Sequence, residues 1–444
     1  MSYAVPLTEG RLRQPLLELA VLPLKLLHLF LNQPALIFLL ALAGMLFRPP
    51  DLKWFPVDRL GFLAVILWLC SCLAVGGQRL RRFPATWPLL GLLLLGLWGA
   101  VTQPYDSQAW SVFAAKWAVP VLFFQVSGMI FSDENSLRKL EIFLLTVLVY
   151  LSAISVFSLF NLHGLVWPAF ISDESIGIHA DRARGPFLQA VANGVCLNLL
   201  GLLALDSFRR GKLNRAVAGI LLLIVPLALL ATKTRAVWAS AAFSVIFLLL
   251  FGSARNLRKA ALALCFLAIA GGGIFLAFHD DVNDFGERLM DRSPVDFRSE
   301  MYQAGWQIFL ERPLLGWGNE WKVQPEVESR VSSFHPEYYV FHNTFLELGV
   351  DHGLLGLGLY LWLIICLFQL GKSKSNFGHP DGAFIGPHFR KLWPLLLAVY
   401  LLNASAVVMN YQFVNAVVFT IAGILASQSE IDRKPLRPYL VVAA

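Results

Sequence analysis

The stretch PLLGLLLLGLWGAV at residues 88–101 contains no charged side chain, and GILLLIVPLALLA at residues 219–231 has the same composition. The whole chain of 444 residues is 57% hydrophobic and 15% charged, whereas a soluble domain carries roughly 25% charged residues. Its mean hydropathy is +0.63. Because uncharged runs of this length are typical of membrane-spanning helices, the composition excludes a soluble globular enzyme and indicates a polytopic membrane protein.

Hydropathy predicts an all-α integral membrane protein with about twelve transmembrane helices, since each crossing needs about 20 apolar residues. The first predicted span is broken by Pro23 and Pro34, and the last two meet at the corner NYQFVN, so the count is open by one. The predicted spans are 16–47, 60–77, 84–101, 109–130, 139–163, 186–207, 214–231, 236–252, 259–278, 343–370, 391–410 and 412–428. They leave one sizeable segment outside the membrane, between the ninth and the tenth span.

The distribution of basic residues predicts the topology, because cytoplasmic loops are enriched in Lys and Arg. The connections on the side of the two termini hold 21 of these residues, and the opposite connections hold 13. Both termini are therefore expected in the cytoplasm, with the segments 164–185, 232–235 and 279–342 on the outer face. We predict transmembrane helices 1–9 within residues 1–278, an outer loop at 279–342, and transmembrane helices 10–12 with a cytoplasmic tail within 343–444.

Part of the outer loop is expected to be helical. The stretch RSEMYQAGWQIFLERPLLGWG starts at Arg298 and has aromatic and aliphatic residues at helical spacing, with Tyr302 and Trp306 following Arg298 at four-residue intervals. Pro313 and the glycines after it are typical of a helix end. We therefore predict an amphipathic helix that ends near Pro313 and lies along the membrane surface.

Basic residues at the outer ends of spans are candidate ligands for a phosphate group. Arg184 lies in RARGPFLQAVANG and Arg235 lies in TKTRAVW, both on the face where positive charge is disfavoured. A guanidinium offers a planar set of donors that fits phosphate and keeps its charge in apolar surroundings. Arg182 and Lys233 are weaker candidates of the same set, and Arg298 can contact phosphate or pair with one of the loop's carboxylates. Snorkelling of these side chains to lipid headgroups is an open alternative.

His342 is the candidate catalytic residue. It stands in FHNTFLELGVDHGLLGLG where the outer loop meets a span, and Asn343 is placed to cap the new helix. An imidazole can accept a proton near neutral pH, and nearby arginines would keep it uncharged and available as a base. The alternative is a histidine that is only packed or solvated. Glu347 can orient a neighbouring group, and His352 is interpreted as structural or accessory.

Other patterns predict no further chemistry. The string GLLGLG from Gly353 lies in an apolar helix, where it predicts close helix packing rather than dinucleotide binding. All five cysteines lie in apolar runs, which favours packing over a zinc site or disulfides. Basic residues occur in short clusters between apolar runs, so binding to nucleic acid is not expected. No P-loop occurs, and we expect neither a metal nor another cofactor, so that the substrate itself must supply the driving force.

Taken together, these strings resemble the bacterial O-antigen ligase and polymerase superfamily. The resemblance rests on HNTFLELGVDHGLLG, preceded by ERPLLGWG and RSEMYQAGW and further upstream by TKTRA and RARGPFLQAVANG, and it covers roughly residues 180–365. It implies a GT-C-like glycosyltransferase of the bacterial inner membrane with its site on the periplasmic side, so that the loop 279–342 would be periplasmic.

The resemblance also implies substrates and residue roles. A ligase of this family moves a polysaccharide from undecaprenyl pyrophosphate onto a sugar of the lipid A core, which completes lipopolysaccharide. His342 would be the motif histidine, and Arg184, Arg235 and Arg298 would contact the donor pyrophosphate. The expected partners are the lipid-linked polysaccharide, the lipid A core acceptor and membrane lipids.

Three functions stay open on the sequence. The first is a metal-independent, inverting O-antigen ligase. The second is an O-antigen polymerase or a protein oligosaccharyltransferase of the same superfamily, which shares these motifs but uses another acceptor. The third is a transporter of lipid-linked sugars, which basic residues within spans, such as Lys25 and Lys116, would favour.

Overall fold

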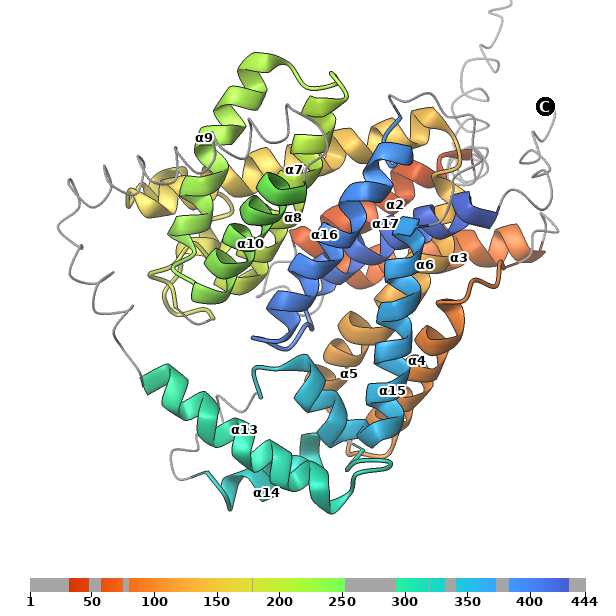
Figure 1. The fold of residues 1–444 in the computed structure, drawn as a ribbon, viewed down its shortest axis with the longest axis vertical. Coiled ribbons are helices and arrows are strands. Elements are labelled where there is room, and N and C mark those ends of the chain that lie inside the picture. Colours follow the sequence, from red (N-terminus) through yellow and green to blue (C-terminus); the bar gives the residue numbers. More distant parts are fainter. Residues whose placement is uncertain are drawn as a thin grey trace, which may run out of the picture.

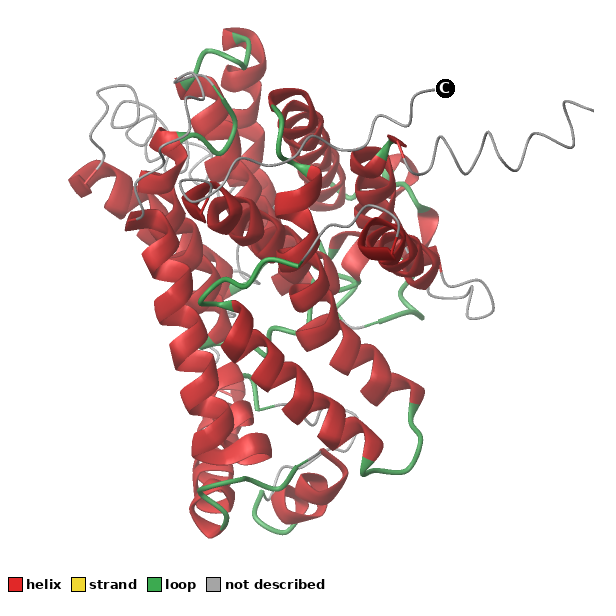
Figure 2. Cartoon of the chain, turned by 90° about the vertical axis from the view of Figure 1, so that its right-hand side faces the viewer, coloured by secondary structure: helices red, strands yellow, loops and turns green. Residues whose placement is uncertain are grey.

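The computed structural model describes residues 32–47, 57–74, 80–177, 179–251, 293–318, 320–331, 341–372 and 383–430. Every regular element within these ranges is a helix (Figure 1, Figure 2), which confirms the all-α class. The predicted span 259–278, the first half of the predicted span 16–47 and both termini lie outside the described residues.

Each predicted span that falls within the described residues lies on a helix. Six helical segments are long and apolar enough to cross a bilayer, and four apolar helices are shorter. A polytopic membrane protein is thus supported, while the number twelve stays a prediction. The described helices of the bundle, of which α5 and α6 together form one of the six segments and α16 belongs to neither group, are α2 (Pro34–Leu46), α3 (Val57–Ala74), α4 (Thr86–Val101), α5 (Ser107–Phe113), α6 (Val119–Ile130), α7 (Glu134–Leu159), α8 (Ala190–Arg209), α9 (Arg215–Ala231), α10 (Arg235–Phe251), α15 (Thr344–Lys372), α16 (Pro387–Ala404) and α17 (Gln412–Glu430).

The connections that were predicted to share the outer face meet at one end of the helical bundle. The backbone N–H of Ala183 donates to the carbonyl of Ala231 at 3.0 Å, which joins the segment before α8 to the turn between α9 and α10. At the same end the hydroxyl of Thr344 donates to the carbonyl of Val407 at 2.9 Å, which joins the start of α15 to the connection between α16 and α17. These contacts agree with the prediction that successive connections lie alternately at the two ends of the bundle.

The connections that were predicted to be cytoplasmic meet at the opposite end. Arg210 donates to Asp206 at 2.8 Å and to the carboxylate of Glu141, which ties α8 to α7. Arg390 is buried and donates to the carbonyl of Leu370 at 2.8 Å, which ties α16 to the end of α15. Several of the arginines counted for the topology therefore also neutralise helix ends and carboxylates. Which end faces the cytoplasm remains a prediction.

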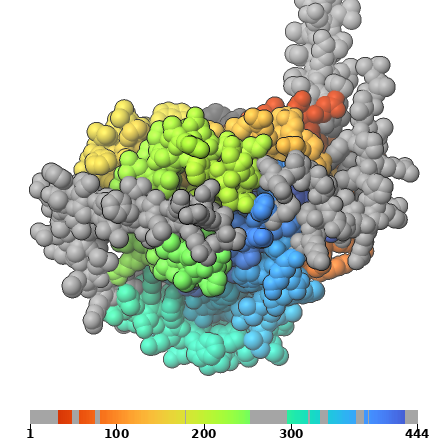
Figure 3. All heavy atoms as spheres, turned by 45° about the horizontal axis from the view of Figure 1, so that its top comes forward, coloured from red at the N-terminus to blue at the C-terminus, as the bar shows by residue number. Residues whose placement is uncertain are grey.

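A small lobe with its own core covers the first of these two ends. It consists of α13 (Ser293–Glu311), α14 (Glu320–Glu328) and the first turns of α15, and in Figure 3 its turquoise helices project at the lower edge. The predicted amphipathic helix is thus confirmed as α13; it begins before Arg298 and ends next to Pro313, whereas α14 was not predicted. The buried apolar residues of the lobe are Met301, Ala304, Ile308, Phe309, Val323, Val327, Val331, Phe341 and Val350.

The predicted span 343–370 lies on α15, but this helix is broken at Gly353, which the sequence analysis did not predict. This residue has φ +62°, a conformation that glycine adopts readily. The segment 313–318, which follows α13, runs beside the break and exchanges backbone hydrogen bonds with it. These run from Trp317 N to Val350 O (2.9 Å), Gly318 N to Asp351 O (2.7 Å), Leu354 N to Pro313 O (2.7 Å) and Leu355 N to Leu314 O (3.2 Å).

The same contacts explain two glycines of the sequence motifs. A Cβ on Gly353 would lie 2.4 Å from the carbonyl oxygen of Leu314, and a Cβ on Gly316, at φ +69°, would lie 2.5 Å from that of Asp351. The close packing expected of GLLGLG therefore involves an extended segment at Gly353 and not another helix. ERPLLGWG and HNTFLELGVDHGLLG form a single structural unit in which each string completes the hydrogen bonds of the other.

Replacing Gly353 with Ala is expected to destabilise this unit. The left-handed conformation costs about 1–2 kcal/mol for a residue with a Cβ, and the contact with Leu314 adds to that loss. Gly358→Ala is the matched control, because Gly358 lies in the same helix with no heavy atom within 4 Å of an added Cβ. Alanine is favoured over glycine in a helix by about 1 kcal/mol. Thermal unfolding in detergent should show a lower Tm for Gly353→Ala alone; equal Tm values would contradict the proposed constraint.

Candidate functional site

His342 precedes α15 in an unusual conformation. Its φ is +52°, which is uncommon for a residue other than glycine and occurs often at functional sites. The predicted cap is confirmed: Oδ1 of Asn343 accepts from the N–H groups of Phe345 (2.9 Å) and Leu346 (3.1 Å). The preceding Phe341 is 2% exposed, so the backbone on both sides of His342 is held in place.

Helix α13 brings two polar side chains to His342. The hydroxyl of Tyr302 donates to the His342 carbonyl at 3.1 Å, and Arg298, one turn earlier on α13, acts on the imidazole through its charge. The helix approaches closely because Gly305 faces Phe341; a Cβ there would lie 2.7 Å from the phenyl ring. The sequence placed Trp306 on the same face, but this side chain is 55% exposed.

The surroundings of His342 keep its imidazole neutral. Burial, followed by the positive charge of Arg298, lowers the pKa of His342 from 6.5 to about 4. Both causes disfavour the protonated form. At pH 7 the ring therefore carries a lone pair that can accept a proton, as the sequence analysis expected.

Arg184 occupies a different environment. It is 1% exposed, and its guanidinium donates to three backbone carbonyls, those of Ile171 (2.9 Å), Asp173 and Ile176. These carbonyls belong to the connection between α7 and α8, which includes the 3₁₀ turns Ala169–Ser172 and Gly185–Phe187. The side chain of Arg184, near the end of this connection, thus holds the earlier part of the same connection, residues 171–176, in place. A phosphate contact through the same nitrogens would have to compete with these hydrogen bonds.

The electrostatics around Arg184 agree with a structural role. Burial lowers the pKa of the guanidinium, while the charges of Asp173, Asp181 and Glu174 raise it. Burial has the larger effect, so the pKa is lowered overall, and the three carboxylates offset only part of it. Its role in binding the donor stays a prediction, whereas its role in ordering residues 171–176 follows from the contacts.

The turn between α9 and α10 carries Lys233 and Arg235. Lys233 is half-buried with φ +47°, and Arg235 is exposed at the first position of α10. The hydroxyl of Thr234 donates to the carbonyl of Thr232 at 2.8 Å, which shapes the turn. Arg182, half-buried, lies beside Ala183, which bonds to the residue before this turn. The structure thus groups Arg182 and Arg184 with Lys233 and Arg235.

The start of α17 and the connection before it contact both groups of residues. On one side the rings of Phe187 and of Phe413, in the first turn of α17, lie 5.9 Å apart, and Phe187 stands three residues after Arg184. On the other side Thr344, two residues after His342, accepts from the N–H of Met409 at 3.0 Å. The four basic residues and the pair formed by Arg298 and His342 therefore lie at the same end of the bundle, joined through this segment.

An ion pair behind the start of α15 was not predicted. Nζ of Lys116 lies 2.8 Å from Oε2 of Glu347, and both side chains are largely buried. Lys116 belongs to a π-helical turn, Ala114–Ala118, between α5 and α6, and such turns are frequent at functional sites. Asn415 donates to the carbonyl of Ala115 at 2.9 Å and so satisfies a backbone group in this turn. The sequence shows the two charges, but no local pattern indicates the π-turn or their pairing.

These observations define a polytopic membrane protein whose candidate site lies where a small helical lobe meets the bundle. The model of the O-antigen ligase family matches residues 218–361. This match confirms the resemblance to the O-antigen ligase and polymerase superfamily over that segment, which contains Lys233, Arg235, Arg298 and His342 but neither Arg182 nor Arg184. No curated protein matches the chain.

Replacing Arg184 with Lys is expected to destabilise the protein. An ammonium group lacks the planar fork that serves three carbonyls at once, and a buried carbonyl left without a donor costs about 1–3 kcal/mol. Arg235→Lys is the matched control, since an exposed conservative change is expected to stay within about 0.5 kcal/mol. Thermal unfolding of both purified variants measures the difference. If Arg184→Lys melts like the wild type, the carbonyl contacts do not stabilise the fold.

Replacing Arg298 with Gln is expected to raise the pKa of His342 from about 4 towards 6.5, although burial keeps it below that value. NMR titration of labelled histidine, assigned with His342→Ala, measures the shift. Arg312→Gln serves as the control, because Arg312 also lies in the lobe but its guanidinium stacks 4.0 Å from the Trp317 ring centroid. The same titration midpoint in Arg298→Gln and the wild type would argue against an electrostatic effect of Arg298.

Proposed function

We propose that this protein is a metal-independent, inverting O-antigen ligase that transfers polysaccharide from undecaprenyl pyrophosphate to the lipid A core. The observation that carries the proposal is the neutral imidazole of His342 beside Arg298, within the segment that matches the O-antigen ligase family. The acceptor would be a sugar hydroxyl of the core oligosaccharide. The protein would work in the bacterial inner membrane, with membrane lipids around the bundle.

The proposed orientation puts the lobe in the periplasm and both termini in the cytoplasm. It rests on the excess of basic residues in the connections at the opposite end of the bundle. In this arrangement residues 1–278 and 343–444 form the transmembrane part, and 279–342 form the periplasmic loop. Exposed Trp306 and Leu310 on α13 would face the membrane surface, as expected of an interfacial helix.

The proposed reaction uses basic side chains to stabilise the leaving group. As the acceptor oxygen forms a bond to the anomeric carbon, the bond from that carbon to the pyrophosphate oxygen breaks, and negative charge grows on the pyrophosphate. Arg235, Lys233 and Arg298 would stabilise this charge through charge-assisted hydrogen bonds. Arg182 is a weaker member of this set, and Arg184 would act mainly by ordering the neighbouring connection.

His342 would act as the general base. Its neutral imidazole would take the proton of the acceptor hydroxyl while that oxygen attacks from the face opposite the pyrophosphate. A single displacement of this kind inverts the configuration of the anomeric carbon. The strained backbone and the hydrogen bond from Tyr302 would hold the ring at the required position.

Two alternative functions remain: transfer to a different acceptor, and transport of lipid-linked sugars. A polymerase or a protein oligosaccharyltransferase of the superfamily would share the donor site and differ in the acceptor. A transporter would be favoured by ionisable groups within spans, yet the charge of Lys116 is compensated by Glu347 in the first turn of α15. The ion pair thus has a structural explanation that requires no transport.

Replacing His342 with Ala is expected to leave the protein folded and inserted but to lower transfer about 10²–10⁴-fold, the usual contribution of a general base. Gel mobility of lipid A core incubated with purified protein and lipid-linked polysaccharide measures the product. His163→Ala is the control, because His163 is exposed in the connection between α7 and α8. Transfer by His342→Ala at a tenth of the wild-type rate or more would refute the assigned role.

The same assay separates the alternatives. Transfer that survives a chelator supports a reaction without a metal, and loss of transfer would overturn that part of the proposal. In a deletion strain, a ligase leaves long lipid-linked chains and no polymer on the core, whereas a polymerase leaves a single repeat attached. Joining of donor to acceptor in detergent, without a gradient, excludes transport as the sole activity.

A further inference from the structure

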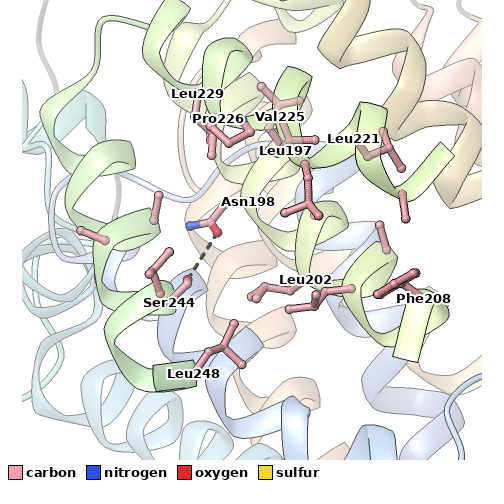
Figure 4. A pocket seen from close by; sticks show the side chains of 18 of the residues that line it. Leu197, Asn198, Leu202, Phe208, Leu221, Val225, Pro226, Leu229, Ser244 and Leu248 are labelled. Atoms are coloured by element: carbon pink, nitrogen blue, oxygen red, sulfur yellow. Dashed lines mark hydrogen bonds between the residues drawn. The ribbon is translucent and has the colours of Figure 1, made fainter. Parts of the chain in front are cut away.

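The helices α8, α9 and α10 line an apolar cavity of about 480 Å³ that is partly open to the surface of the bundle (Figure 4). It extends along α9 from Ala218 to Leu230 and along α8 from Leu197 to Phe208, roughly 16–18 Å at a rise of about 1.5 Å per residue. Helix α9 packs mainly against α7 and α8 and touches α10 little, which leaves this space between the helices.

The polar residues in the wall of the cavity are already paired with each other. Asn198 donates to the hydroxyl of Ser240 at 3.2 Å, and the hydroxyl of Ser244 donates to the amide oxygen of Asn198 at 3.3 Å (Figure 4). Internal pairing of this kind leaves little need for a polar ligand. The other side chains that Figure 4 labels, among them Leu202, Val225 and Leu248, are apolar. The cavity is therefore suited to a hydrocarbon chain.

One end of the cavity lies beside the basic turn of the candidate site. Leu229, Leu230 and Trp238 line this end, and Lys233 and Arg235 lie between them in the sequence. The N–H of Lys233 donates to the carbonyl of Leu230 at 2.9 Å, so the basic turn is bonded to a residue that lines the cavity. A long apolar space that ends at two cationic side chains is complementary to a lipid with a phosphate headgroup and an extended chain.

We propose that this cavity holds the part of the polyprenyl chain that lies next to the pyrophosphate of the lipid-linked donor. The inference rests on the proposed function, since it places the carrier of the same donor. The phosphates lie at Lys233 and Arg235, and the chain runs between α8 and α9 towards the opposite end of the bundle. The cavity thereby directs the reacting end of the donor towards the lobe.

Photolabelling of the full-length protein in detergent tests this inference. The probe is undecaprenyl phosphate with a diazirine in its isoprenoid chain, and labelled peptides are mapped by mass spectrometry. Gly201→Phe fills the cavity from α8, because Gly201 lines it. Gly219→Phe is the matched control, since an added Cβ at Gly219 on α9 meets no heavy atom within 4 Å and the residue lies outside the lining.

We expect labelling of lining residues on α8 and α9, a decrease of at least fivefold in Gly201→Phe, and wild-type labelling in Gly219→Phe. Ala242→Phe fills the cavity from α10 and provides a second variant should Gly201→Phe lower the Tm. Labelling that both filled variants retain would overturn the inference. Equal labelling by a diazirine-bearing phosphatidylglycerol would also overturn it, because the cavity would then be a general lipid site.

Two further experiments test whether the phosphate headgroup is needed for binding and whether a segment of the protein itself fills the cavity. Undecaprenol, which lacks phosphate, should compete with the probe at least fivefold more weakly than undecaprenyl phosphate does. Disulfide formation between Cys placed at Val225 and Cys placed within residues 259–278 would show that a segment of the chain itself fills the space, which refutes the inference.

Failure of the inference and failure of the proposed function give different results. His342→Ala should be labelled like the wild type, because His342 is remote from the lining residues in sequence and is absent from the cavity wall. Normal labelling without transfer by the wild type would refute the ligase and leave the cavity assignment intact. Transfer that is unaffected by filling the cavity would refute the cavity assignment alone.

Discussion

An exchange of backbone hydrogen bonds between residues 313–318 and the break in α15 holds the candidate site together. The break at Gly353 interrupts the helical hydrogen bonds, and the segment after α13 has polar groups of its own to satisfy. A buried polar group without a partner costs about 1–3 kcal/mol, so each segment depends on the other. Because α13 ends where the exchange begins and His342 stands before α15, this contact determines where Arg298 lies relative to the imidazole.

Local signals in the sequence were enough for most helices and for parts of the site. Hydropathy located the spans because uncharged runs of sufficient length have one stable conformation in a bilayer. Asn343 and Pro313 marked a helix start and a helix end because capping and the missing N–H of proline act over a few residues. The placement of Arg298 and His342 at one site was expected from the resemblance to a family, since nothing in the spacing of these residues brings them together.

The features that were missed depend on contacts that only the folded chain creates. Arg184 at the end of a span is compatible with a headgroup, a phosphate or a carbonyl ligand, and only the fold of residues 171–176 selects the last of these. Lys116 and Glu347 pair through helices that are far apart along the chain. Gly353 in an apolar string is typical of helix packing, and the break becomes evident only when the segment 313–318 lies beside it.

The different exposures of the basic residues suggest how donor binding and proton transfer are linked under the proposed function. Arg184 is buried against carbonyls, whereas Arg235 is exposed and Arg298 is half-buried, so an anion from outside can approach the latter two more easily. Burial and, secondly, the charge of Arg298 lower the pKa of His342. A pyrophosphate beside Arg298 would offset the effect of this charge and raise the basicity of the imidazole. His342 would then be a stronger base with the donor bound than in the empty site, although burial would still keep its pKa below 6.5.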